Sequence, residues 1–366
     1  MKWKKQLLDL TPYQPGKSIE DVKKEYGLEK IVKLASNENP FGCSEEAAKA
    51  LQKSSGIFAK YPDGYAGELR SILASHLGTE PGQLIFGNGS DEVIQIISRA
   101  LLGPGRNTIM AAPTFPQYKH NAVIEGAEVK EIPLLDGAHD LEGMLEAIDE
   151  NTSVVWLCSP NNPTGIYINE SKLVSFLEKV PEDILVVLDE AYCEYAVADD
   201  YYHAVSLLEK FSNLIVLRTF SKIYGLASLR IGYGIAGEDV IRALEPAREP
   251  FNVNTFAQMA AAEAVKDQQY VEECRNRNRE GLEQFYSFCD QAGLSYYPSQ
   301  GNFILIDFKR DANEVFQYLL EKGYIVRSGA GLGCPQSIRV TIGSKEQNEE
   351  IMELIGQFLE ETAAAL

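Results

Sequence analysis

The chain has 366 residues, and its 45% hydrophobic and 24% charged residues are typical of a globular protein. This length exceeds what one ordinary hydrophobic core supports, so we expect two domains or one large elaborated domain. The formal net charge of −19 argues against a nucleic-acid-binding surface or a polybasic membrane contact, because both need clustered lysine and arginine.

The cysteines and histidines argue against metal and disulfide chemistry. Six cysteines are dispersed without a CxxC pair, and four histidines show no HxxH or HExxH spacing. Reduced thiols fit this pattern better than a disulfide framework or a zinc site, so we expect no metal. The basic N-terminal segment has no apolar signal core, and no apolar run has the length of a spanning helix. We therefore expect a cytoplasmic protein with no membrane partner.

Short apolar runs alternate with helical patterns in the first two thirds of the chain. Several of these runs, such as ILVVL and SVVWLC, are continuous rather than alternating, as expected for parallel strands buried on both faces by crossover helices. This pattern predicts an α/β doubly wound sheet. The runs occupy residues 83–86, 107–112, 127–132, 153–158, 184–188, 213–217 and 231–236.

The pattern changes after about residue 250. A long helical stretch is followed by strand and helix signals that alternate up to a final helix with an apolar stripe, which can cover a small sheet. These features predict a second, smaller α+β domain. The stripe consists of Ile351, Leu354, Ile355, Phe358 and Leu359.

Ligands of open α/β sheets bind beyond the carboxyl ends of the strands. After the first run, GNGSDE opens a helix with Ser90 or a near neighbour as N-cap, and its amides could receive a phosphate; an ordinary βα turn is the alternative. After the fourth run, two prolines stiffen SPNNPTG so that it can aim the amide of Asn162, or the loop forms a structural Asx-turn.

A carboxylate, a lysine and an arginine follow the next two runs. Asp189 comes directly after ILVVL, where a buried carboxylate needs a donor or cation unless it is solvated or caps a helix. RTFSKIYGLASLRIGYG then carries Lys222 and Arg230 with the hydroxyls of Thr219 and Ser221. A phosphate site, a nucleophilic lysine and a carboxylate suited to a protonated heteroatom together predict pyridoxal 5'-phosphate as the cofactor.

With these motifs the chain resembles the fold-type I pyridoxal-phosphate aminotransferases, and within them it is similar to the histidinol-phosphate aminotransferases. The resemblance implies an α/β large domain (41–250) with a mostly parallel seven-stranded sheet, a smaller α+β C-terminal domain (251–366), and an N-terminal arm (1–40) that packs with the small domain. The further motifs that carry it are LTPYQPG (10–16), ASNENPFG (35–42), KYPDGY (60–65), PTFPQY (113–118), DEAY (189–192), GNFIL (301–305), IVRSG (325–329) and SIRVTIG (337–343).

The resemblance assigns three catalytic residues, Lys222, Asp189 and Tyr192. Lys222 would bond to the cofactor as an imine, Asp189 would pair with the pyridine nitrogen, and Tyr192 with Asn162 would approach the ring's phenolic oxygen. Tyr61 would reach the cofactor phosphate of the neighbouring subunit, which makes a homodimer the expected unit. The other implied cofactor-binding residues are Ser90, Asp91, Thr219, Ser221 and Arg230 at the phosphate, and Phe115 stacked on the ring.

The implied reaction is a ping-pong transamination of L-histidinol phosphate with 2-oxoglutarate, giving imidazole-acetol phosphate and L-glutamate, in histidine biosynthesis. Arg339 would bind the carboxylate of glutamate, and Arg327 with Tyr13 and Asn37 would accommodate the substrate phosphate; without the resemblance, either arginine could be a surface strand residue. The alternatives are an aromatic amino-acid aminotransferase and a pyridoxal-phosphate decarboxylase of a phosphorylated amino acid. A ligand-sensing regulator is disfavoured, because the chain lacks the charge of a DNA-binding module.

Overall fold

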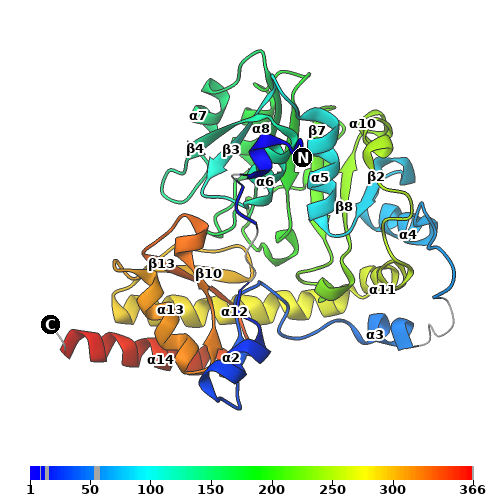
Figure 1. Cartoon of the computed structure of the whole chain (residues 1–366). Helices are drawn as coiled ribbons and strands as arrows, with labels where there is room; N and C mark the ends of the chain where they lie inside the picture. Colours follow the sequence, from blue (N-terminus) through cyan, green and yellow to red (C-terminus); the bar gives the residue numbers. More distant parts are fainter. Residues whose placement is uncertain (9, 13–15, 53–57, 365–366) are drawn as a thin grey trace.

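The computed structural model describes residues 1–8, 10–12, 16–52 and 58–364 (Figure 1). The largest of its sheets has seven strands. Each predicted apolar run forms one strand: β2 (Leu84–Gly87), β3 (Asn107–Ala112), β4 (Glu128–Pro133), β5 (Thr152–Cys158), β6 (Leu185–Asp189), β7 (Leu214–Thr219) and β8 (Gly232–Ala236). The strand order is β2–β8–β7–β6–β5–β3–β4, and β8 alone runs antiparallel to the other six strands. The predicted α/β class with a mostly parallel sheet is confirmed.

Helices cover both faces of this sheet. Along β6, Val186 and Leu188 belong to one core cluster and Val187 to the other, so successive side chains are buried on opposite faces. One cluster takes side chains from α5 (Ser90–Leu101), α6 (Gln117–Glu125) and α10 (Glu238–Leu244). The other takes them from α4 (Gly67–Leu77), α7 (Leu141–Glu146), α8 (Glu170–Leu177), α9 (Ala204–Leu207) and α11 (Thr255–Lys266), with α3 (Glu45–Gln52) beside α11.

A second, four-stranded antiparallel sheet follows in the C-terminal part of the chain, in the order β12–β13–β10–β9. As predicted, the apolar stripe of the last helix covers it: Ile351, Ile355 and Phe358 are buried in the same core as the strand residues Ile304 and Val340. The elements are α12 (Gln268–Ala292), β9 (Ser295–Tyr296), β10 (Phe303–Asp307), α13 (Ala312–Glu321), β12 (Arg327–Ser328), β13 (Ser337–Thr341) and α14 (Lys345–Ala364).

The N-terminal segment contacts both parts of the molecule. After α1 (Lys5–Leu8), which lies against α6, α2 (Ile19–Tyr26) buries Val22 against Leu320 and Ile325. The short strand β1 (Val32–Lys33) then pairs in parallel with β11 (Tyr324–Ile325). The expected domain limits at residues 40 and 250 stay a prediction. Within the described ranges, none of the helices combines the length and hydropathy needed to cross a bilayer. The 3₁₀ turns are η1 (Pro81–Gln83), η2 (Cys193–Tyr195), η3 (Ala227–Leu229), η4 (Glu245–Ala247) and η5 (Gly329–Leu332).

A buried ion pair joins the carboxyl ends of β6 and β7. Glu190 is 0% exposed, and both Nε and Nη2 of Arg218 lie 2.8 Å from its Oε2. Burial raises the pKa of Glu190, and the guanidinium of Arg218 opposes that rise. Because a buried carboxylate is costly without its partner, this pair holds the two strand ends together next to Asp189.

Replacing Arg218 by methionine removes the charge and keeps most of the volume. We expect Arg218→Met to lower the free energy of unfolding by about 3–5 kcal/mol, because Glu190 stays buried without its cation. Urea unfolding followed by circular dichroism measures the change. The matched control is Arg242→Met, which breaks an exposed pair with Asp239 and should cost less than about 0.5 kcal/mol. Equal losses in the two variants would show that the buried pair does not stabilise the fold.

Candidate active site

A cavity of about 420 Å³ opens at the carboxyl ends of β2, β5, β6 and β7, where the C-terminal sheet meets the seven-stranded one. It brings together residues that lie far apart in the sequence. The predicted site residues that line the cavity are Asn37, Ser90, Asp91, Phe115, Asn162, Asp189, Tyr192, Thr219, Ser221, Lys222, Arg230, Arg327 and Arg339.

The first turn of α5 forms one wall of the cavity and provides donors for an anion. Gly89, with φ 77°, is the N-cap, and Ser90 is the first helical residue rather than the cap itself. Arg230 extends along this helix end, with Nη1 3.2 Å from Ser221 Oγ and Nη2 3.3 Å from Asp91 Oδ2. Amides at a helix N-terminus next to a guanidinium and a hydroxyl make a binding site suited to phosphate.

Two glycines allow these donors to approach one another. A Cβ atom on Gly89 would lie 2.6 Å from Nη2 of Arg230, and one on Gly232 would lie 2.3 Å from the backbone nitrogen of Ser90. Side chains at either position would therefore push β8 or Arg230 away from the helix end. We call the set formed by the α5 N-terminus, Ser221 and Arg230 the anion cradle.

Asp189 ends β6 at the floor of the cavity and is only 3% exposed. Its Oδ2 accepts a 2.7 Å hydrogen bond from the hydroxyl of Tyr118, and its Oδ1 accepts one of 3.1 Å from the amide of Ala191. Burial raises the pKa of Asp189 to about 6, although both hydrogen bonds oppose the rise. The carboxylate is thus ionised near neutral pH and can hold a protonated ring nitrogen.

Lys222 follows β7 and lines the cavity, with its Nζ over the ring of Tyr192, 5.7 Å from the ring centroid. Its Nζ donates a 3.3 Å hydrogen bond to the carbonyl of Ser36. Burial, together with the positive charge of Arg339, lowers the pKa of Lys222 to about 8. Lys222 therefore reaches its neutral, nucleophilic form far more readily than an ordinary lysine.

A hydrogen-bond chain connects the C-terminal sheet to the cavity. Arg339 is 6% exposed and donates from Nη1 to Asn162 Oδ1 at 2.5 Å and from Nη2 to the carbonyl of Ala35 at 2.8 Å. The hydroxyl of Tyr192 accepts from Asn37 Nδ2 at 3.0 Å and from Asn162 Nδ2 at 3.4 Å. Burial raises the pKa of Tyr192, so its hydroxyl stays protonated and can itself donate to a ligand oxygen.

Arg327 and Arg339 lie directly opposite each other on the paired strands β12 and β13. Residues opposite each other in an antiparallel pair project from the same face of the sheet. Both arginines line the cavity, so the C-terminal sheet presents two guanidinium groups to whatever enters it. Neither is a simple surface strand residue, which was the alternative open from the sequence.

Among the described residues, one predicted site residue, Tyr61, does not line this cavity. Tyr61 is 82% exposed and stacks on Phe251, with ring centroids 4.8 Å apart. Tyr13 lies outside the described residues. Tyr61 therefore lies at the surface and does not line the site of its own chain. Its expected contact with the cofactor of a neighbouring subunit stays a prediction.

Two residues that contact the site were not predicted from the sequence, the buried Tyr118 and the partly buried His139. Tyr118, which donates to Asp189, lies on the first turn of α6 and stacks on Trp156 with ring centroids 4.9 Å apart. His139 accepts a 3.3 Å hydrogen bond at Nε2 from the amide of Cys158, and burial lowers its pKa to about 4. Tyr118 belongs to the PTFPQY motif and could have been found there, whereas no motif marks His139.

The comparisons with known proteins agree with this geometry. The family model described as aminotransferase class I and II matches residues 29–355, and the chain belongs to that family. The histidinol-phosphate aminotransferase from Geobacillus sp. (strain WCH70) is 64% identical over 99% of this chain and 99% of its own. The one from Bacillus subtilis (strain 168) is 62% identical over 98% of this chain and 100% of its own. The crystal structure of histidinol-phosphate aminotransferase from Sinorhizobium meliloti in complex with pyridoxal-5'-phosphate is 28% identical, covers 98% of both chains and has a TM-score of 0.89.

Membership of this class indicates pyridoxal phosphate as the cofactor, and the cavity fits that molecule. The anion cradle suits its phosphate and the ionised Asp189 its pyridine nitrogen, while Lys222, with its lowered pKa, suits its aldehyde. These three features converge on one cavity of about 420 Å³, a volume in the range of small-molecule sites.

Asp189 makes the stability of the cofactor-free protein depend on pH. The pKa of Asp189 rises from 3.8 to about 6 on folding, so ionisation of this side chain destabilises the folded state. The loss of stability is absent below pH 4, grows between pH 4 and 6, and is complete above pH 6. Asp189→Asn should therefore stabilise the cofactor-free protein at pH 7–8 by up to about 3 kcal/mol and leave it nearly unchanged at pH 4. Urea unfolding across this pH range measures the difference.

The variant Tyr118→Phe is the companion test. It removes a hydrogen-bond donor that favours the charged form of Asp189, so the pKa of Asp189 should rise further. The pH-dependent loss of stability should then continue to a higher pH than in the wild type. Asp239→Asn serves as the control, because that side chain is 94% exposed. A stability gain in Asp189→Asn that does not change with pH would contradict the assigned ionisation.

Proposed function

We propose that this protein transfers the amino group of L-histidinol phosphate to 2-oxoglutarate, giving imidazole-acetol phosphate and L-glutamate in histidine biosynthesis. The relatives named above support this reaction. The observation that carries it is that one cavity collects a cofactor set, formed by the anion cradle, Asp189 and Lys222, and two additional guanidinium groups, those of Arg327 and Arg339. A substrate with a phosphate at one end and a co-substrate with carboxylates both need such cations.

In this proposal each cofactor-binding residue holds one part of pyridoxal phosphate. When bound, the cofactor provides an electron sink for the bond that breaks at the substrate's Cα atom. Asp189, ionised above pH 6, holds the proton on the pyridine nitrogen, and Asn162 with Tyr192 donates toward the phenolic oxygen. The remaining residues are Phe115 on the ring face, and the amides of Ser90 and Asp91 with Thr219, Ser221 and Arg230 at the phosphate.

Lys222 is the proposed nucleophile and proton carrier. In its neutral form Lys222 would hold the cofactor through the aldehyde carbon. Once the substrate amine has displaced it, the freed Nζ would be the base that accepts the proton leaving the substrate's Cα. A pKa near 8 makes this form accessible close to neutral pH.

The two substrates would use the same cavity in turn, which gives ping-pong kinetics. Arg339 binds the carboxylate of glutamate or 2-oxoglutarate, and Arg327 with Asn37 and Tyr13 accommodates the phosphate of histidinol phosphate. Because the two arginines are register partners on β12 and β13, a single sheet face would recognise both substrates.

A second copy of this chain is the proposed partner. Four large aromatic side chains are exposed near the start of α4 and before α11, which is costly in a monomer and typical of an interface. In a homodimer, Tyr61 would reach the cofactor phosphate of the neighbouring subunit. A cytoplasmic location is supported by the free thiols of the six cysteines. The aromatic side chains are Phe58, Tyr61, Tyr65 and Phe251.

The covalent role of Lys222 has a direct test. Purified wild-type protein should be yellow and, after borohydride reduction, should carry the mass of the cofactor, with attachment accelerating as pH rises through about 8. Lys222→Ala should lose the mass addition and turnover. The control is Lys210→Ala, at an exposed lysine paired with Glu178. Normal turnover by Lys222→Ala would remove the proposed mechanism.

Substrate choice can be tested through Arg327. Arg327→Met should lower kcat/KM for histidinol phosphate by about 10- to 100-fold, the usual loss for one charge-assisted hydrogen bond, and should change the half-reaction with glutamate much less. Stopped-flow measurement of the two half-reactions separates these effects. A wild-type preference for phenylalanine would favour the aromatic aminotransferase, and carbon dioxide release without need of 2-oxoglutarate would favour the decarboxylase.

A further inference from the structure

The turn formed by Phe251 and Asn252, between η4 and α11, contacts two functionally distinct segments at once. The ring of Phe251 stacks on that of Tyr61 at 4.8 Å with planes 21° apart. Phe251 has a φ of 57°, in the left-handed region that bulky side chains rarely adopt. Such a conformation persists where the surroundings hold it, and it often marks a functional position.

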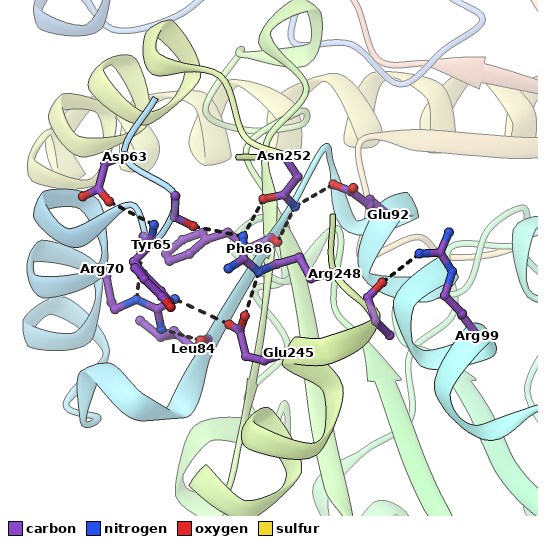
Figure 2. A network of polar contacts seen from close by, with 12 residues as sticks. Asp63, Tyr65, Arg70, Leu84, Phe86, Glu92, Arg99, Glu245, Arg248 and Asn252 are labelled. Atoms are coloured by element: carbon purple, nitrogen blue, oxygen red, sulfur yellow. Dashed lines mark hydrogen bonds and ion pairs between the residues drawn. The ribbon is translucent and has the colours of Figure 1, made fainter. Parts of the chain in front are cut away.

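Asn252 connects this turn to Glu92 in the first turn of α5, whose N-terminus belongs to the anion cradle (Figure 2). Its Nδ2 donates to the carbonyl of Phe86 at 3.0 Å and to Glu92 Oε2 at 2.9 Å. Its backbone carbonyl accepts from Asn88 Nδ2 at 2.9 Å. Glu92 Oε2 also accepts from the amide and the side chain of Asn88, at 2.5 and 3.0 Å. The turn that precedes Gly89 and the α5 N-terminus is therefore held by Asn252 and Glu92 together.

Arg248 extends the same network to the segment that carries Tyr61. Its Nη1 donates to Asn252 Oδ1 at 2.9 Å and to the carbonyl of Gly64 at 3.0 Å, and its Nε donates to Glu245 Oε2 at 2.9 Å. The side chain of Arg248 is 10% exposed, so water cannot readily replace these bonds. A Cβ on Gly64 would lie 3.3 Å from the ring of Phe251, which shows how closely the two segments pack.

We propose that the Phe251–Asn252 turn transmits occupation of the anion cradle to the Tyr61 segment, residues 60–65, of the same subunit. An anion bound by the α5 amides orders the turn at Asn88. Because Asn88, Glu92, Asn252 and Arg248 share hydrogen bonds, this order extends to Gly64 and Tyr61 without a large movement. This coupling rests on the proposed dimer, in which Tyr61 faces the site of the second subunit. Filling one site would then prepare the other site of the dimer.

Mixed dimers isolate this route from direct contact. One subunit, labelled with ¹⁵N, keeps an intact site, and its partner carries Lys222→Ala and Arg230→Met so that its own site stays empty. Hydrogen exchange of the labelled peptide 58–68 is measured by mass spectrometry with and without pyridoxal phosphate. The labelled Tyr61 then faces an empty site, so any protection there must arise through its own chain. We expect exchange at least about fivefold slower with cofactor, the lower end for coupled sites.

Asn252→Ala in the labelled subunit should abolish this protection, and Arg248→Met should do the same if Asn252→Ala fails to fold. The matched control is Arg99→Ala, since Arg99 bonds Ala247 and Glu249 in the same region (Figure 2) without touching Asn252. Protection that persists in both variants, or that appears only on the unlabelled subunit, would overturn the proposed coupling. A wild-type chain that forms no dimer or binds no pyridoxal phosphate would instead overturn the proposed function.

Discussion

The close approach of β8 to the N-terminus of α5 is the constraint on which the site depends. Because β8 alone runs against its neighbours, its beginning, rather than its end, lies at the edge where the parallel strands finish. Gly232 at this point leaves room for the amide of Ser90, and Arg230 just before it turns along the helix end. The helix amides and the guanidinium can then act on one anion, although neither alone would define a phosphate site.

Burial of the cavity acts on its acid and its base in opposite directions. It raises the pKa of Asp189 to about 6 and lowers that of Lys222 to about 8, because low solvent access disfavours either charge. Above pH 8, Asp189 is ionised while Lys222 is mostly neutral, which is the combination that the proposed chemistry needs. Between pH 6 and 8 a fraction of Lys222 already has this form. Burial is thus the largest cause of both pKa shifts, and the positive charge of Arg339 adds to the shift at Lys222.

The sequence predicts the strands and the cavity residues at their carboxyl ends because both follow local rules, whereas Asn37, Phe115, Tyr192, Arg327 and Arg339 are implied only by the family resemblance. Continuous apolar runs mark β5 and β6, and a charged residue directly after such a run, as at Asp189, marks a strand end facing a ligand. Contacts between distant segments follow no such rule. Tyr118 meets Asp189 across 71 positions, and Asn252 meets Phe86 across 166. Only the folded chain shows that these residues fix the orientation of Asp189 and the shape of the cradle.

Recognition and chemistry are supported by different cores in this molecule. Lys222, Asp189 and the anion cradle rest on the seven-stranded sheet, whereas Arg327 and Arg339 come from the four-stranded one. The 2.5 Å hydrogen bond from Arg339 to Asn162 links the two. Under the proposed function, substitutions at Arg327 on β12 can therefore alter which anions are accepted with little effect on the groups that bind the cofactor, whereas substitutions at Arg339 on β13 also reach Asn162 and Lys222. Related enzymes can in this way share one chemical centre and differ in substrate, and Asn162 is the point at which a change in recognition would reach the chemistry.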